Sequence, residues 1–229
     1  SRQGIPAYFE SIGLMDRERS KPMRDDTIFR IYSMSKPITS IALMMLWEEG
    51  RFQLTDPVHR FIPSWRGQEV WERGEGDQLV TRRPANPPTM QHILSHTAGL
   101  TYGGLLPGLE SPVDQAYQDL GIARGDCETL LEFADKLGRV PLLYDPGHNW
   151  CYSLATDVCG ALVEIISGQP FESFLRERIF EPLGMTDTGF RVTDEKLDRF
   201  AACYMRSMDK QVLESLKEWL VRDLKLMFT

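Results

Sequence analysis

The hydrophobic period of this 229-residue chain changes abruptly at Ser33, and this change constrains the fold more than any other feature. Before Ser33, residues 7–14 and 27–32 carry the aromatic and β-branched side chains that are typical of short strands. After Ser33, apolar residues recur at helical spacing, at Ile38, Ile41, Ala42, Met45 and Leu46. The sequence therefore predicts a β-hairpin followed directly by one long amphipathic helix.

Helical patterns also dominate the middle of the chain. Apolar spacing and stop signals predict four further helices, at residues 89–96, 126–137, 153–167 and 170–180. Residues 65–88 and 101–125 are rich in Gly, Pro and polar side chains, so we expect surface loops there. Near the end, residues 211–227 have an apolar stripe that predicts an amphipathic helix.

Charge and hydropathy exclude two classes of partner. The formal net charge is -7, and no basic run exceeds the pair Arg82 and Arg83, so a nucleic-acid partner is not expected. Residues 38–47 are the longest apolar candidate, which is too short and too interrupted for a membrane span of roughly 18 residues. We expect neither nucleic acid nor membrane as a partner.

Two further signals suggest a cytoplasmic location. The first ten residues lack the basic start and apolar middle of a signal peptide, although a trimmed chain would lack them too. The four cysteines, at positions 127, 151, 159 and 203, form no C-x-x-C pair. The cytoplasm is therefore the expected compartment, with a periplasmic or secreted location as the alternative.

Ser33 and Lys36 form an S-x-x-K motif at the predicted helix start. Pro37 would clash with the carbonyl of Ser33 inside a helix, so hardly a full helical turn can precede Ser33. At a helix start, unpaired N–H groups favour an alkoxide and can donate to an oxyanion. Lys36 lies one turn further on the same face, where a desolvated amine can accept the proton of Ser33. This arrangement indicates a serine nucleophile.

The S-x-x-K motif alone does not identify the nucleophile, because it occurs twice. The second copy runs from Ser207 to Lys210, in a polar stretch without a preceding strand or a following apolar helix, and we interpret it as accidental. For Ser33 the alternative is a simple N-cap serine.

A second candidate base is Tyr152. It follows the turn sequence Asp145-Pro146-Gly147 and immediately precedes a predicted helix, so we expect its hydroxyl to be held at a rigid corner. A tyrosine titrates near 10, so it can act as a base only where cations such as Lys36 stabilise the phenolate. The alternative is a packing residue with a hydrogen-bonded hydroxyl.

Three longer blocks resemble the β-lactamase-related serine esterases, the family VIII carboxylesterases. These are SMSKPITSIALMMLWEEGRFQLTDPV, HILSHTAGLTYG and YDPGHNWCYSLATDVCGALVEIISGQPFESFLRERIFEPLGMTDTGF. This group is similar to class C β-lactamases and D-alanyl-D-alanine carboxypeptidases, and the resemblance runs from about residue 7 to residue 204.

The resemblance implies an α+β fold of the β-lactamase/transpeptidase type. Such a fold has an antiparallel sheet with flanking helices and a mostly helical sub-domain, which we expect at residues 1–60 with 190–229 and at residues 61–189. The resemblance also implies that Ser33 is acylated, that Lys36 and Tyr152 transfer protons, and that water releases the acid. Neither a metal nor a cofactor is expected. We expect the substrate site to be lined by Tyr102, His148, Trp150 and Leu154.

The chain departs from the family pattern in two places. Position 154 is Leu, whereas lactamases and peptidases have Asn there, and an apolar residue favours ester over amide substrates. Nothing after Met205 matches the third family motif, a Lys/His/Trp-x-Gly that supplies an oxyanion donor. Family members are also longer, so we expect the chain to lack the C-terminal part and its sheet to be incomplete.

Two hypotheses about function follow. The first is a serine carboxylesterase for short-chain acyl esters, with weak β-lactam hydrolysis as an additional activity. The second is a catalytically impaired binding protein, or a fragment, that lacks the third motif. A homo-oligomer or a second chain would complete the sheet.

His92 and His96 have a metal-like i, i+4 spacing, but no third ligand is evident and we interpret both as helix residues. No G-x-S-x-G elbow is present.

Overall fold

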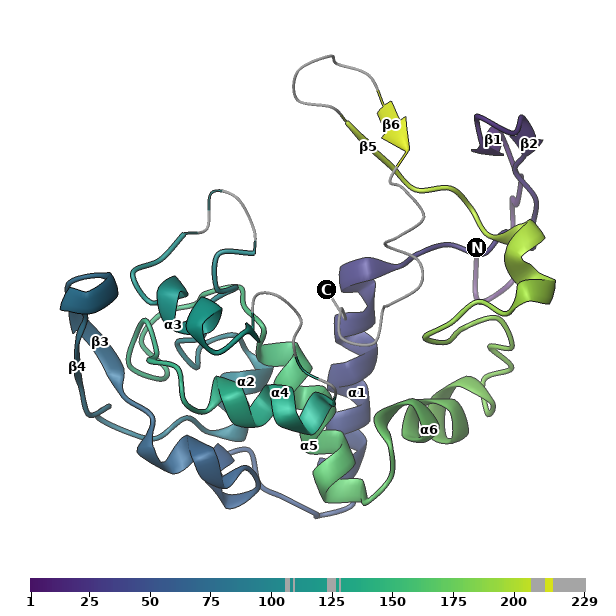
Figure 1. The fold of residues 1–229 in the computed structure, drawn as a ribbon. Coiled ribbons are helices and arrows are strands. Elements are labelled where there is room, and N and C mark those ends of the chain that lie inside the picture. Colours follow the sequence, from purple (N-terminus) through teal and green to yellow (C-terminus); the bar gives the residue numbers. More distant parts are fainter. Residues whose placement is uncertain (106–107, 109, 123–126, 128, 207–212, 216–229) are drawn as a thin grey trace. The chain divides into compact units, whose positions relative to one another are not determined.

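The computed structural model describes residues 1–105, 108, 110–122, 127, 129–206 and 213–215 (Figure 1). They form two compact units, which are described separately. Unit 1 consists of residues 1–32 and 186–225, and unit 2 of residues 33–185, each in its described part. Helix α1 (Ser35–Glu48) thus belongs to unit 2. The sub-domain boundaries expected at residues 60 and 189 stay a prediction.

Helix α5 (Ala155–Ser167) is the centre of unit 2 (Figure 1). Every residue from 155 to 163 is buried, because four helices pack against it: α1, α2 (Met90–Leu94), α4 (Leu130–Leu137) and α6 (Phe171–Leu175). Gly160 permits this packing, since a Cβ there would lie 3.0 Å from Leu130 and 3.4 Å from Phe171. The core of unit 2 is therefore built around one apolar helix.

Helix α1 confirms the long helix predicted after Ser33. Of the predicted apolar stripe, Ala42 and Leu46 are buried, whereas Ile41 is 56% exposed. Leu43 completes the buried face, which is therefore rotated relative to the predicted one. The helix ends before Gly50, whose φ of +72° lies in the left-handed region where glycine is favoured. Arg51 then donates from Nη2 to the carbonyl of Ile166 at 2.7 Å and joins the ends of α1 and α5.

The other predicted helices are present but shorter. Thr89 and Thr129 accept hydrogen bonds as N-caps, so α2 and α4 begin only after these residues. The expected helix at 170–180 divides into α6 and a π-helical turn, Arg176–Phe180. The expected loop at 101–125 contains a short helix, α3 (Asp114–Asp119).

A hairpin lies in the region that was expected to be a loop at residues 65–88. Strands β3 (Val70–Arg73) and β4 (Val80–Arg82) pair antiparallel, with a 3-10 turn, Gly76–Gln78, between them. Leu142 exchanges backbone hydrogen bonds of 2.8 Å with Trp71 and Glu69, and this fixes the hairpin to unit 2. The loop expectation was wrong because partner strands outweighed the Gly and Pro content. Two more 3-10 turns precede the hairpin, at Val58–Arg60 and Pro63–Gly67.

In unit 1 the expected hairpin is displaced along the chain. The strands are β1 (Leu14–Asp16) and β2 (Lys21–Pro22), not residues 7–14 and 27–32. A strand requires a partner strand, and within residues 27–32 only Ile28 forms a β-bridge, which is parallel and joins it to Phe200. The β-propensity of those segments therefore did not decide their structure.

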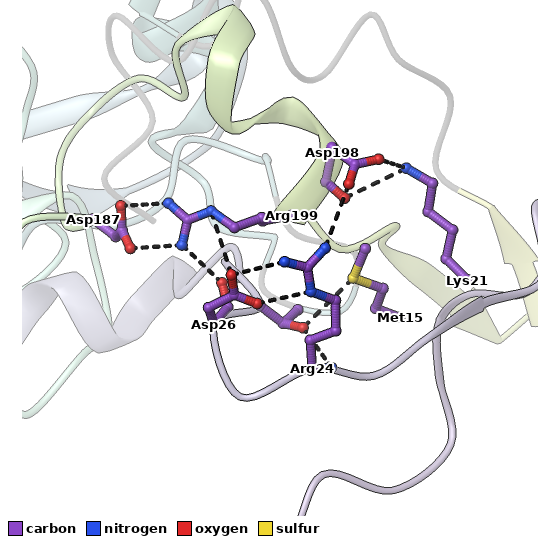
Figure 2. A network of polar contacts seen from close by, with 8 residues as sticks. Met15, Lys21, Arg24, Asp26, Asp187, Asp198 and Arg199 are labelled. Atoms are coloured by element: carbon purple, nitrogen blue, oxygen red, sulfur yellow. Dashed lines mark hydrogen bonds and ion pairs between the residues drawn. The ribbon is translucent and has the colours of Figure 1, made fainter.

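A network of charges holds residues 186–200 to residues 21–26 within unit 1 (Figure 2). Arg199, at the end of the 3-10 helix Asp194–Arg199, donates two hydrogen bonds to Asp187, at 2.8 and 2.7 Å, and one to the carbonyl of Asp26 at 3.0 Å. Arg24 forms a paired contact of 2.9 Å with the carboxylate of Asp26. Hydrogen bonds from Arg199 and Lys196 lower the pKa of Asp187 well below its usual range.

The last described strand corrects another expectation. Residues 213–215 lie within the helix predicted at 211–227, yet they form strand β6 (Leu213–Ser215). It pairs antiparallel with β5 (Tyr204–Arg206), and this backbone pairing outweighs the helical spacing of the apolar residues. The rest of the predicted helix and the second S-x-x-K copy lie outside the described residues.

The described strands form three separate antiparallel pairs and no closed sheet. Several large apolar side chains of unit 1 are exposed, namely Ile5, Tyr8, Phe9, Ile12 and Phe29. Among the described residues no helix is long and apolar enough to cross a membrane.

Candidate active site

Ser33 lies in a 3-10 turn, Tyr32–Met34, that leads directly into α1. Its side chain is exposed. No full helical turn precedes it, as expected from the position of Pro37. The hydroxyl is therefore presented to solvent at the start of a 14-residue helix.

Lys36 lies one turn further along and is 8% exposed. Its Nζ donates a hydrogen bond to Ser33 Oγ at 3.4 Å. The backbone at the helix start thus places a largely buried ammonium group beside an exposed hydroxyl. A positive charge at this position stabilises negative charge that develops on the serine oxygen or on a neighbouring base.

Tyr152 reaches the same serine from the other side. Its hydroxyl is 2.9 Å from Ser33 Oγ, and Lys36 Nζ lies 4.9 Å from the centre of its ring. Burial would raise the pKa of Tyr152, but hydrogen bonds involving Lys36, Ser33 and Tyr102, together with the charge of Lys36, lower it below its usual value. The phenolate form is therefore favoured relative to an ordinary tyrosine.

The segment that carries Tyr152 is held by backbone hydrogen bonds to residues 96–101. Gly147 and Cys151 donate to the carbonyls of Thr97 and His96, at 2.8 and 2.9 Å. Leu154 donates to Thr101 at 3.2 Å, immediately before α5 begins. The predicted rigid corner thus consists of two segments, residues 96–101 and 147–154, that are joined by backbone hydrogen bonds.

Aromatic side chains surround the tyrosine. Tyr102 and His96 each lie 5.2 Å from the Tyr152 ring, centre to centre. Trp150 stacks on it at 6.2 Å with an interplanar angle of 20°. Burial and the neighbouring Tyr152 raise the pKa of Tyr102 above its usual range, so Tyr102 keeps its proton and can donate it in a hydrogen bond.

A buried carboxyl group lies beneath this site. Asp157, in the first turn of α5, is 3% exposed, and its Oδ2 has no hydrogen-bond partner. Burial raises the pKa of Asp157 to about 7, although the charge of Lys36 opposes the shift. Asp157 is therefore an ionisable group that titrates near neutrality and senses the charge of the candidate catalytic lysine.

The four residues expected to line a substrate site lie near Tyr152 in two different environments. Trp150 is 65% exposed and His148 is also exposed. Tyr102 and Leu154 are buried, at 2% and 4% exposed, and offer little surface to a ligand. Contact of these side chains with a substrate stays a prediction.

The described residues contain no group of three metal-ligating side chains. His92 accepts a hydrogen bond from the Thr89 backbone at Nδ1, 3.2 Å away. His96 was expected to be a helix residue, and this expectation was wrong. It follows the end of α2 and has a left-handed backbone conformation with φ +56°. Both of its ring nitrogens contact hydroxyl groups, of Ser153 at 3.1 Å and Thr156 at 3.4 Å.

His96 and Asp157 are therefore the two residues at this site that sequence reasoning missed. The acidic residue inside the apolar run of α5 was a visible signal, because a lone carboxylate on a buried helix face is uncommon. For His96 the only signal was the glycine three positions later, which marks the end of a helix.

Together these residues can support nucleophilic acyl transfer. Ser33 can supply the nucleophile, because Lys36 and Tyr152 both lie within hydrogen-bond distance of its hydroxyl. Among the described residues, no carboxylate or imidazole group forms a hydrogen bond with Ser33 Oγ. The arrangement therefore differs from a Ser-His-Asp triad.

Comparison with known proteins gives consistent matches over nearly the whole chain. A family model described as Beta-lactamase matches residues 1–222. Esterase EstB of Burkholderia gladioli is 38% identical over 204 residues, which cover 89% of this chain and 48% of EstB. The chain thus spans about half the length of this relative.

Two solved structures have similar folds. EstCE1, described as a hydrolase with promiscuous acyltransferase activity, superposes with a TM-score of 0.74 at 34% sequence identity. The match covers 92% of this chain and 51% of the EstCE1 chain. Simvastatin synthase (LovD) from Aspergillus terreus superposes with a TM-score of 0.75 at 28% sequence identity. The match covers 93% of this chain and 53% of the LovD chain.

Proposed function

The chain belongs to the β-lactamase family, and on this premise we propose that it is a serine carboxylesterase that acts through an acyl-enzyme on Ser33. The family and the likeness to EstCE1 confirm the predicted β-lactamase/transpeptidase-like α+β fold. The observation that carries the proposal is the position of Ser33 Oγ, 2.9 Å from the Tyr152 hydroxyl and 3.4 Å from Lys36 Nζ.

In the first half of the proposed reaction, Ser33 Oγ attacks the ester carbonyl and its proton passes to the Tyr152 phenolate. The lowered pKa of Tyr152 supports this role, because it raises the fraction of phenolate at neutral pH. The bond to the alkoxy group breaks, and the departing alcohol takes the proton from Tyr152. The backbone N–H of Ser33 is the proposed donor to the oxyanion.

In the second half, water attacks the acyl group on Ser33 and gives its proton to Tyr152. The carboxylic acid leaves, and Ser33 Oγ recovers the proton. Lys36 keeps a positive charge beside both oxygens throughout, which stabilises the phenolate. These reaction steps require no cofactor.

We further propose short-chain esters in place of amides as substrates. Leu154 stands where the lactamases and peptidases have an amide side chain, and at 4% exposure it presents no polar group to the site. A missing polar contact at a site that must orient an amide costs a few kcal/mol, or roughly 100-fold or more in kcat/KM. Turnover of p-nitrophenyl butyrate should therefore exceed that of nitrocefin by about this factor.

Transfer of the acyl group to an alcohol is a second candidate function. EstCE1 is described as having promiscuous acyltransferase activity, and this observation favours testing alcohols beside water as acceptors. Ester product formed in the presence of an added alcohol, at the expense of acid, would support it.

The test of the proposed function is covalent labelling of the 229-residue chain by a fluorophosphonate. We expect the label on Ser33 and on no other serine, and we expect Ser33→Ala to abolish both labelling and ester turnover. The variant should remain folded, because Ser33 is exposed and does not cap α1: the N-cap residue is Met34, and no side chain makes a capping hydrogen bond. Label on Ser207, or on no serine, would instead support the catalytically impaired binding protein.

A further inference from the structure

His96 contacts the two residues that flank Tyr152 in the sequence, Cys151 and Ser153. Its carbonyl accepts a hydrogen bond from the Cys151 backbone at 2.9 Å, and its Nδ1 is 3.1 Å from Ser153 Oγ. Its Nε2 is 3.4 Å from Thr156 Oγ1, and its ring lies against the Tyr152 ring with centres 5.2 Å apart and planes tilted by 43°. One residue thus touches the positions directly before and after the tyrosine as well as the tyrosine itself.

The backbone of His96 adopts a conformation that needs support from its surroundings. Its φ of +56° is left-handed, which costs a non-glycine residue of the order of 1 kcal/mol. Such a conformation persists where surrounding contacts determine it, and these sites are often functional. Here the contacts are the ones to the Tyr152 segment, so conformation and packing of His96 support one another.

We infer that His96 is a positioning residue that holds the Tyr152 hydroxyl against Ser33 and Lys36. The inference rests on the proposed function, in which Tyr152 transfers the proton. His96 acts as the neutral imidazole, because burial and the positive charge of Lys36 lower its pKa to about 4. A neutral ring can donate to one hydroxyl and accept from the other, which matches its contacts with Ser153 and Thr156.

His96→Asn separates this role from backbone strain. Asparagine tolerates a positive φ better than other non-glycine residues, but it has no ring to place beside Tyr152 and cannot reach both hydroxyls. The Tyr152 hydroxyl would then lose its fixed distance to Ser33 and Lys36. We expect the pKa of Tyr152 to rise toward the ordinary value of about 10, since its stabilising contacts weaken.

The experiment compares ultraviolet titrations of phenolate formation in four proteins: the parent chain, His96→Asn, Tyr152→Phe and the double variant. Subtracting each Tyr152→Phe curve isolates the titration of Tyr152 in each background. The same proteins are assayed for ester turnover, where His96→Asn should lower kcat by about 10- to 100-fold and leave KM within about threefold. In the Tyr152→Phe background it should have little further effect, because the two residues act as one unit.

His92→Asn is the matched control, because it removes another half-buried histidine of the same region. It should lower stability without moving the Tyr152 titration. An unchanged Tyr152 titration in His96→Asn, or an equal loss of kcat in both backgrounds, would overturn the inference. Absence of turnover in the parent chain would contradict the proposed function instead, and the titration would still decide the role of His96.

Discussion

At the scale of single residues, burial decides which charges the site can use. Lys36 and Asp157 are both buried, yet Asp157 has an oxygen without a partner while Lys36 contacts Ser33 and lies over the ring of Tyr152. A buried carboxylate without full hydrogen bonding is costly, so the fold favours its protonated form. Asp157 therefore offers a direct test of the electrostatics beneath Lys36.

We predict that Asp157→Asn removes a pH-dependent loss of stability. The pKa of Asp157 rises from 3.8 to about 7 on folding, so its favourable contribution is complete below pH 3.8 and is lost as the pH rises to about 7. The change in pKa from 3.8 to about 7 corresponds to about 4 kcal/mol at most. Urea unfolding across this range should show the parent losing stability relative to the variant, which is the more stable of the two at pH 8. Parallel stability curves would show that Asp157 does not titrate in this way.

At the scale of elements, the packing around α5 depends on how closely its neighbours approach. Four helices contact α5, and Gly160 lies where α5 meets Leu130, the first residue of α4, and Phe171, the first of α6. Protein interiors are close-packed, so added atoms at such a position must displace neighbours. The sizes of side chains at position 160 should therefore control the stability of unit 2.

We predict that Gly160→Val destabilises the protein by about 1–3 kcal/mol through overpacking against Leu130 and Phe171. Gly160→Ala is the matched control. Its single methyl group would meet the flexible end of Leu130 at 3.0 Å, and alanine favours a helix over glycine by up to about 1 kcal/mol, so the two effects should largely cancel. Thermal or urea unfolding measures both, and equal stabilities of the two variants would contradict the packing argument.

At the scale of the whole molecule, the two units differ in how well they bury apolar groups. Unit 2 has a continuous core around α5, whereas unit 1 has two-stranded pairs and a surface network of ion pairs. An isolated two-stranded hairpin is marginal in water, so unit 1 relies on contacts such as those of Arg199 with Asp187 and Asp26.

We predict that the exposed apolar residues of unit 1 make the 229-residue chain bind hydrophobic dyes and self-associate. Phe9 and Ile12 are 71% and 74% exposed. Replacing both with serine should lower dye binding and the apparent mass in solution, because exposed apolar surface drives association. Leu183→Ser, at a comparably exposed position of unit 2 (69%), is the control and should change neither. Equal effects of both changes would show that unit 1 is not the source.

Local rules were sufficient for the position of Ser33 at the start of α1 and for the helices that frame it. Pro37 limits where α1 can begin, and apolar spacing with Gly50 sets its extent, so Ser33 and Lys36 follow from a few neighbouring residues. The same holds for α5, whose apolar run ends at Gly168. These features depend on contacts within one helical turn, which the sequence displays directly.

Only the tertiary structure decided which distant groups meet. Tyr152 is 119 positions from Ser33, and no local pattern reports the 2.9 Å between their hydroxyls. His96 received its left-handed conformation and Asp157 its raised pKa from segments packed against them, and the strands of unit 1 formed where a partner was available. Helix formation is satisfied within one segment, whereas strand pairing, burial and charge–charge distances depend on where the rest of the chain lies.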